Sequence, residues 1–404
     1  MGAGDLLTAS LAGSRFGLTL LWAAWLGALL KWFLNEGVAR WQMATETTLI
    51  EGLVIRAGSW IRWAFGAYLV AWAFFTGGAL VTACGVAGTG ILPLSANLTT
   101  SKILWGMIHS MIGILVVLRG GFRTFQRLMM VCVGLMFVAV VLTAALLRPD
   151  LSAMLTGLTI PSIRSLPSPS GTAYTLGVLG GVGGTVTLLS YGYWIRERGR
   201  TGARGVAESR IDLAAGYVVT AVFGLAMIVV GSRVTLERGP TAALELAGQL
   251  SLTLGPAGRW IFLIGFWAAV FSSLLGVWQS VPYLFADLVR AGDSGAEGRP
   301  GSEAASQTGR ERRAYRGFLL YLGTVPVALL WTTLEHAQLL YAVFGALFMP
   351  LLALALLVMN NRTAWVGYQF RSGWVTNLAL AATLALFAWV GGRELVTALR
   401  GLVG

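Results

Sequence analysis

The most restrictive feature of the sequence is a long apolar stretch whose middle is rich in glycine. Residues 174–194 (YTLGVLGGVGGTVTLLSYGYW) are apolar and, at roughly 20 residues, long enough to cross a bilayer as one helix. Five glycines lie in its central part, namely Gly177, Gly180, Gly181, Gly183 and Gly184. Each weakens a helix by about 1 kcal/mol relative to alanine. The pattern therefore favours a spanning helix that is broken within the membrane.

Two interpretations fit these glycines. In secondary transporters, a broken span offers free backbone carbonyls and half-helix ends to a substrate near the midplane. The alternative is close helix packing, because the glycines also form the small-xxx-small pairs Gly177/Gly181 and Gly180/Gly184. A second glycine cluster, at residues 2–5 (GAGD), favours the first interpretation. Corresponding breaks in two halves of a chain indicate an inverted-repeat transporter.

The composition is typical of a protein with many membrane-spanning segments. The chain has 404 residues, of which 56% are hydrophobic and 11% are charged, whereas soluble domains carry about 25% charged residues. The net charge of +12 does not indicate a nucleic-acid partner, because the arginines lie in short loops between apolar spans. The two cysteines, Cys84 and Cys132, fall inside expected spans and indicate no disulfide framework.

Signatures of an enzyme are missing from the sequence. It contains no H-E-x-x-H motif, no G-x-S-x-G motif with triad partners, no P-loop and no cysteine and histidine cluster with metal-ligand spacing. We therefore expect no catalytic activity and no resident cofactor.

Ten apolar windows follow an initial segment, residues 1–14, that is too short to cross the membrane. The windows cover residues 18–39, 63–86, 103–118, 128–147, 174–194, 211–232, 260–286, 317–334, 338–358 and 374–392. With the initial half-helix, the chain has about eleven membrane elements in one polytopic domain. We expect a first repeat at 1–173, a second at 174–359, an extra helix at 374–392, and a flexible cytoplasmic loop at 291–314.

The loops between these windows differ in charge. When they are assigned alternately to the two sides of the membrane, nineteen basic residues fall on one side and nine on the other, with Lys31 inside a span. The richer side is expected to be cytoplasmic, since basic loops stay inside. This predicts an integral protein of a bacterial-type plasma membrane.

Few ionisable or strongly polar residues lie inside the expected spans, so each is a candidate for function. Asp5 follows Gly4 at the expected start of a half-helix, where a carboxylate either caps free N–H groups or binds a cation. Lys31 and Asn35 lie one helical turn apart in the second span. We expect Lys31 to reach the headgroups or to pair with another helix. Gln279 is a further polar side chain within a span.

Two other ionisable residues have simpler interpretations. Asp287 lies near the expected cytoplasmic end of its span, and we expect it to be solvated. His109 is able to titrate near neutral pH, but a single histidine among apolar residues is more often only hydrogen-bonded. Neither residue is among the site candidates.

Several segments resemble the Nramp family of divalent-metal transporters. They are GGFRTFQRLMMVCVGLMFVAVVLTAALLRPD (120–150), the GxxG at Gly177–Gly180, SLAGSRFGLTLLW (10–22), the helix with Ser272-Ser273, and MPLLALALLVMNNRTAWVGYQFRSGWVTN (349–377). The resemblance covers essentially the whole chain in element order and loop length. It implies about eleven helices in a LeuT-like inverted repeat with a cytoplasmic N-terminus, in agreement with the charge count.

The metal-ligand motifs implied by this resemblance differ in the present chain. The family's first broken helix has Asp-Pro-Gly-Asn, and the matching residues 2–5 are Gly-Ala-Gly-Asp, so one ligand is lost and the other becomes an aspartate. The family's sixth helix offers an alanine carbonyl and Met-Pro-His, which match Gly181 and residues 184–186 (Gly-Thr-Val). Ala71 and Phe74 replace the acidic residues of its third helix. The family's proton relay is therefore not expected.

Without the methionine sulfur, a metal site in this chain would consist of oxygen atoms. Such a site suits a hard ion such as Mg²⁺ or Ca²⁺. The predicted substrate- or metal-binding residues are Asp5, Gly2, Gly181, Gly184, Thr185 and Thr187; the predicted hinge of the broken helices is Gly4, Gly177, Gly180 and Gly183; and Gln279 and Asn35 are secondary candidates.

These features predict an all-α integral membrane protein with a LeuT-like bundle, in which the first element is incomplete. Either the chain lacks the inner half of its first helix or its start was assigned too late, and we expect the second. Its expected function is secondary transport of a cation, with a divalent metal ion as substrate and the lipid bilayer as its other partner. Two alternatives stay open. One is a transporter of a small organic solute on the same scaffold, and the other is a non-transporting relative whose site has decayed.

Overall fold

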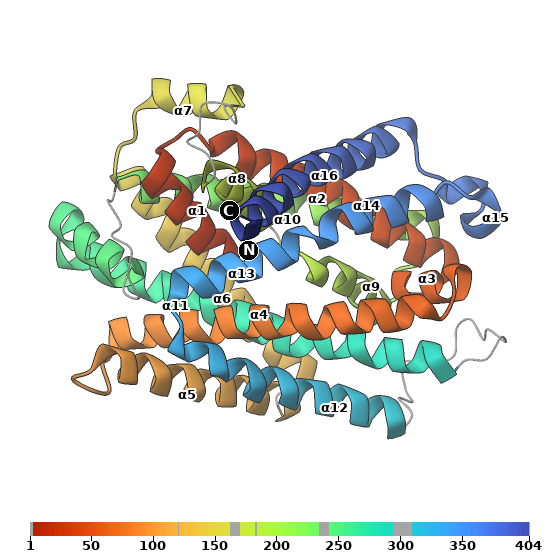
Figure 1. Ribbon diagram of the computed structural model, residues 1–404, viewed down its shortest axis with the longest axis horizontal. Coiled ribbons are helices and arrows are strands. Elements are labelled where there is room, and N and C mark those ends of the chain that lie inside the picture. The colour runs from red at the N-terminus through yellow and green to blue at the C-terminus, as the bar shows by residue number, and fades with distance from the viewer. Residues whose placement is uncertain are drawn as a thin grey trace.

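Helices form every regular element in the part of the chain that the structure describes. In this computed structural model, that part comprises residues 3–119, 121–161, 170–181, 184–233, 242–293 and 309–403 (Figure 1). The first elements are α1 (Ala3–Phe16), α2 (Leu21–Thr45), α3 (Leu49–Ala57), α4 (Trp60–Ile91), α5 (Leu98–Arg119), α6 (Gly121–Leu146), α7 (Leu151–Thr159) and α8 (Ser170–Gly181). They are followed by η1 (Val186–Ser190), α9 (Tyr191–Glu197), α10 (Gly202–Ser232), α11 (Ala242–Asp293), α12 (Gly309–Thr324), η2 (Val325–Trp331), α13 (Leu334–Ala346), α14 (Phe348–Met359), α15 (Thr363–Val366), η3 (Tyr368–Phe370) and α16 (Trp374–Val403), where η denotes a 3-10 helix.

The observed helices correspond to the apolar windows of the sequence. Among the described residues, six helices are long and apolar enough to cross a membrane, namely Trp60–Ile91, Leu98–Arg119, Gln126–Leu146, Gly202–Ser232, Gly255–Ala291 and Gly309–Trp331. Two shorter apolar helices lie at Phe344–Met359 and Trp374–Trp389. The window at 174–194 is divided into α8, η1 and α9. The prediction of an all-α polytopic membrane protein is confirmed.

Two groups of helices pack against each other. α4, α5, α11 and α12 lie side by side along the long axis of the molecule, in the lower part of Figure 1. In the second group, α1 and α2 both pack against α8 and α10. α13 contacts α4 and α8 and so connects the groups, as does α6 by contacting α10 and α11. The divided span therefore lies between other helices of the protein.

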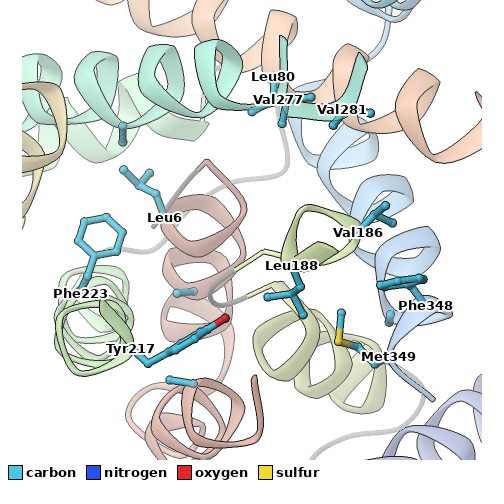
Figure 2. Close-up of a cluster of buried hydrophobic side chains, with 14 of the residues drawn as sticks. Leu6, Leu80, Val186, Leu188, Tyr217, Phe223, Val277, Val281, Phe348 and Met349 are labelled. Carbon is cyan, nitrogen blue, oxygen red and sulfur yellow. The ribbon is translucent and has the colours of Figure 1, made fainter. Parts of the chain in front are cut away.

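Apolar side chains surround the divided span. Figure 2 shows side chains of η1 among buried residues of α1, α4, α10, α11 and α14. They are Val186 and Leu188 of η1 with Leu6, Leu80, Tyr217, Phe223, Val277, Val281, Phe348 and Met349, none more than 9% exposed. Between helices in a membrane, such clusters act through van der Waals packing rather than through the hydrophobic effect. This packing fixes the helices around η1.

Ion pairs connect the helices at one end of the molecule, where α3 and α9 lie (right in Figure 1). Glu51 of α3 pairs with Arg290 of α11 and lies 3.8 Å from Arg196 of α9. Asp287 of α11 accepts hydrogen bonds from the hydroxyl of Tyr193 in α9 and, at 3.1 Å, from Arg290. Asp287 is only 7% exposed. The prediction that it is solvated is wrong, because α3 and α9 cover this end of α11.

Candidate functional site

The helix of the central span stops at Gly181 and resumes at Tyr191. Gly184 has φ +86°, in the left-handed region that favours glycine. Thr185 follows with φ −130° and ψ −101° and precedes the 3-10 turns of η1. Regular α-helix returns at Tyr191, the first residue of α9. The span is therefore broken, and the break lies on the carboxyl side of α8.

Protein encloses the break. Residues 174–181, ahead of the break, are all buried; within it, Thr185 is 1% and Val186 0% exposed, whereas Gly184 and Thr187 are half-buried. Irregular backbone at membrane depth is tolerated where it is buried in protein or lines a water-filled cavity. The surrounding helices meet the first condition here.

Close packing and unwinding occur in successive parts of the same span. A Cβ atom on Gly27 of α2 would lie 2.9 Å from the carbonyl oxygen of Leu179, so this glycine allows α2 to approach α8 closely. A Cβ atom on Gly180 would lie 3.3 Å from Cβ of Ala346 in α13. Gly177 and Gly180 both lie inside α8. Packing thus dominates along α8, and the chain unwinds after it.

A tryptophan and a glycine contact the unwound segment on one side. Trp72 Nε1 of α4 donates a hydrogen bond to Thr185 Oγ1 at 3.1 Å, and both side chains are buried. The methyl group of Thr185 would lie 2.7 Å from a Cβ atom on Gly345 of α13. Neither Trp72 nor Gly345 was predicted from the sequence. The available signal is an indole N–H in the middle of an apolar span, because a buried indole usually finds an acceptor.

A buried lysine contacts the end of α8. Lys31 of α2 is 1% exposed, and its Nζ donates a hydrogen bond to the carbonyl oxygen of Gly180 at 2.5 Å. Of the two expectations for Lys31, contact with another helix is confirmed and a position among the headgroups is wrong. The reason is that its side chain points toward α8, inside the protein. Glu36, five residues further, instead binds Arg40 and Arg210.

Asn35 lies one turn further along α2 and contacts α10. Its Nδ2 donates a hydrogen bond to the hydroxyl of Tyr217 at 3.2 Å. Its Oδ1 is buried and has no hydrogen-bond partner in the described part of the chain. Lys31 and Asn35 therefore place an ammonium and an unpaired acceptor on adjacent turns of one helix.

α1 runs beside α8 and extends beyond its carboxyl end. Phe16, at the end of α1, packs edge-on against Tyr174 near the start of α8, with ring centroids 5.7 Å apart. The two helices are in contact, and because the end of one meets the start of the other, they run antiparallel. A helix rises about 1.5 Å per residue, so Gly181 at the end of α8 lies level with about Ala9, and the first turn of α1 extends beyond the end of α8. Gly4 and the backbone of Asp5 belong to this turn.

The other predicted residues lie in three places. The structure does not describe Gly2, Gly183 or the side chain of Asp5. Thr187 is half-buried in η1, and its Oγ1 would lie 2.7 Å from a Cβ atom on Gly184. The backbone carbonyl of Gln279 in α11 accepts a hydrogen bond from the hydroxyl of Tyr315 in α12 at 3.3 Å. The side-chain oxygen of Gln279, Oε1, is buried and has no partner among the described residues. Gly181, Gly184, Thr185 and Thr187 thus lie in one segment. Trp72 contacts this segment at Thr185, and Lys31 contacts the end of α8 at Gly180.

His109 is hydrogen-bonded on both sides of its ring. Trp267 Nε1 of α11 donates to His109 Nε2 at 2.9 Å, and His109 Nδ1 lies 2.7 Å from the carbonyl oxygen of Trp105. These contacts select the neutral tautomer with its proton on Nδ1.

The described side chains include no group of three or more His, Cys, Asp or Glu that could hold a metal ion. The described residues of the break therefore offer an ion only backbone carbonyl and threonine hydroxyl oxygens.

The helix arrangement and the buried break define a polytopic membrane protein with a discontinuous spanning helix. The family model described as Natural resistance-associated macrophage protein-like matches residues 1–397. The chain belongs to this family, Nramp. No curated protein sequence matches the chain significantly.

Solved structures show the same fold. A mutant of the Eremococcus coleocola manganese transporter aligns with a TM-score of 0.73 and 17% identity, over 100% of this chain and 85% of that one. The same transporter in complex with an aromatic bis-isothiourea substituted compound aligns with a TM-score of 0.71 and 18% identity, again over 100% of this chain and 85% of that one. MhsT in complex with L-phenylalanine aligns with a TM-score of 0.55 and 16% identity, over 98% of both chains. The predicted LeuT-like architecture is confirmed.

Proposed function

We propose that this protein is a secondary transporter that moves a divalent metal ion across the membrane by alternating access. The observation that carries the proposal is the buried break between Gly181 and Tyr191 in a chain of the Nramp family. Unwound backbone in discontinuous helices coordinates ions in secondary transporters. The similarity in fold to a manganese transporter supports the same assignment.

The proposed ligands are oxygen atoms on both sides of the break. The carbonyls of Gly181 and Gly184 and the hydroxyls of Thr185 and Thr187 come from the unwound segment, and the carboxylate of Asp5 comes from the first turn of α1. Oxygen ligands suit hard ions that keep part of their hydration shell. We therefore propose Mg²⁺ as the first ion to test, with Ca²⁺ and Mn²⁺ as comparisons.

Ion flux into proteoliposomes tests this function. Wild-type protein is expected to carry at least one of the three ions, and Asp5→Ala is expected to abolish that flux while the protein stays folded. Asp150→Ala is the matched control, because Asp150 is an exposed N-cap of α7. Undiminished flux in Asp5→Ala would reject the role of Asp5, and no divalent flux in the wild type would reject the function.

A small organic solute is the second candidate substrate, and the position of Lys31 favours it. A buried ammonium at the end of α8 attracts a carboxylate and repels a cation. MhsT, whose fold is similar, is seen with L-phenylalanine. A ligand that binds only the folded protein raises its melting temperature. Stabilisation by amino acids and not by divalent ions would favour this candidate over the first.

We also propose that the end of the molecule with α3 and α9 faces the cytoplasm of a bacterial-type plasma membrane, because the basic loops gather there. Ser59, between α3 and α4, is exposed. A cysteine at this position (Ser59→Cys) should react with a membrane-impermeant thiol reagent in inverted vesicles and not in intact cells. The reverse labelling pattern would overturn the orientation.

A further inference from the structure

The break in the central span creates an open carbonyl at Gly180. In an uninterrupted helix this carbonyl would accept a hydrogen bond from the amide four residues later, which is that of Gly184. In the structure the Gly184 amide instead donates to the oxygen of Gly181 at 3.4 Å. The oxygen of Gly180 accepts the ammonium of Lys31 at 2.5 Å. The lysine therefore uses an acceptor that exists because the helix stops.

The ammonium occupies the position that a bound cation would take at this carbonyl. A Mg²⁺ ion binds an oxygen ligand at about 2.1 Å, which lies within the volume filled by Lys31 Nζ. The lysine is 1% exposed, so water screens its charge poorly. A divalent ion at the Gly180 carbonyl would thus meet a steric obstacle, and the ammonium adds a positive charge beside the neighbouring carbonyls.

A purely structural role is the alternative explanation for this contact. Lysines near the ends of helices hydrogen-bond to the last carbonyls, and Lys102 does so after η2, where its Nζ donates to the oxygen of Thr332 at 2.8 Å. Lys31 differs in two respects. Its acceptor directly precedes the predicted ligand Gly181, and its own helix carries the unpaired Oδ1 of Asn35 one turn away. Both features place Lys31 at the substrate segment.

We propose that Lys31 sets the ion selectivity of the broken span. Its ammonium is a tethered cation on the Gly180 carbonyl, and a divalent metal ion binds at the break only when the ammonium leaves this position. The inference rests on the proposed function. It implies that the wild-type site binds divalent ions weakly, and that removal of the positive charge makes the site a stronger one.

Binding of Mg²⁺ and Mn²⁺ to the purified full-length protein in detergent tests the inference by isothermal titration. Lys31→Met keeps the length of the side chain but removes its charge. The Kd of this variant for the two ions should fall at least about tenfold relative to the wild type, because the repulsion is lost. Lys31→Arg keeps the charge and should bind no more tightly than the wild type. Lys102→Met, the matched control, removes the other buried lysine and should leave the Kd unchanged.

Equal or weaker binding by Lys31→Met, with an intact size-exclusion profile, overturns the inference. If Lys31→Met does not fold, Lys31→Gln takes its place as a neutral donor. Divalent flux separates this inference from the proposed function. Flux in the wild type without tighter binding in the variant rejects only the inference. Flux in Lys31→Met alone supports the inference and rejects metal transport by the wild type, and no binding or flux in either protein rejects both.

Discussion

Lys31 and Lys102 make the same contact in two different regions of the molecule. Each is buried, with 1% and 5% of its surface exposed, and each ammonium donates to a backbone carbonyl at the end of a helical segment. The acceptor Thr332 lies where one helical span ends and the next begins, whereas Gly180 lies within a single span. The same side chain therefore completes a helix end in one region and occupies a break in the other.

Glycines allow the close approach of helices in both regions. Gly85 of α4 faces α5 so closely that an added Cβ atom would lie 2.3 Å from the carbonyl oxygen of Lys102. Gly27 of α2 faces α8, where an added Cβ atom would lie 2.9 Å from the carbonyl oxygen of Leu179. The obstacle is backbone in both cases, so it cannot rotate away. The contact beside Lys102 is the tighter of the two.

The largest expected effect comes from adding a methyl group at each of these two glycine contacts between helices. Gly85→Ala should lower the free energy of unfolding by about 3 kcal/mol and Gly27→Ala by about 2 kcal/mol, as expected for overpacking. Chemical denaturation in detergent micelles measures both changes. Gly66→Ala is the control, because its Cβ atom would meet only Leu288 Cδ1, at 3.9 Å. If Gly85→Ala is as stable as this control, the account of close packing is wrong.

The lysines themselves provide the next test of the comparison. Lys31→Met should cost about 1–3 kcal/mol of unfolding free energy, because it leaves the enclosed Gly180 carbonyl without this donor. Lys102→Met should cost about 0.5–1 kcal/mol, because Thr332 is half-exposed and water replaces the lost donor. Melting of the purified variants in parallel measures the difference. Equal losses would show that the two carbonyls have the same environment, which would remove the distinction between the two regions.

The membrane architecture was predictable because it depends on local composition. Apolar windows and basic loops identify the spans, and clustered glycines identify the one that breaks. Asp287 shows where this reasoning fails: its burial depends on α3 and α9, which no local pattern places over the end of α11. The repeats at 1–173 and 174–359 stay predictions, as does the flexible loop at 291–314, which falls largely outside the described residues.

The candidate site was predictable only where it consists of consecutive residues. Gly181, Gly184 and Thr185 lie close together in the sequence, so their glycine pattern and position in a span point to the same segment. Lys31 and Trp72 reach that segment from α2 and α4, and their contacts arise only when the helices pack. A single sequence indicates that a buried lysine or indole needs a partner but does not identify that partner, and the binding roles of all these residues stay predictions.

The smallest expected effect concerns the hydrogen bond between Trp72 and Thr185, in the region of the broken span. Thr185→Val keeps the shape of the side chain but removes the acceptor for the indole N–H, and should cost about 1 kcal/mol of unfolding free energy. In a double-mutant cycle with Trp72→Phe, the two losses should be less than additive by about 0.5–1 kcal/mol, since either change alone breaks the hydrogen bond. Additive losses would mean that Trp72 stabilises α4 without holding the unwound segment.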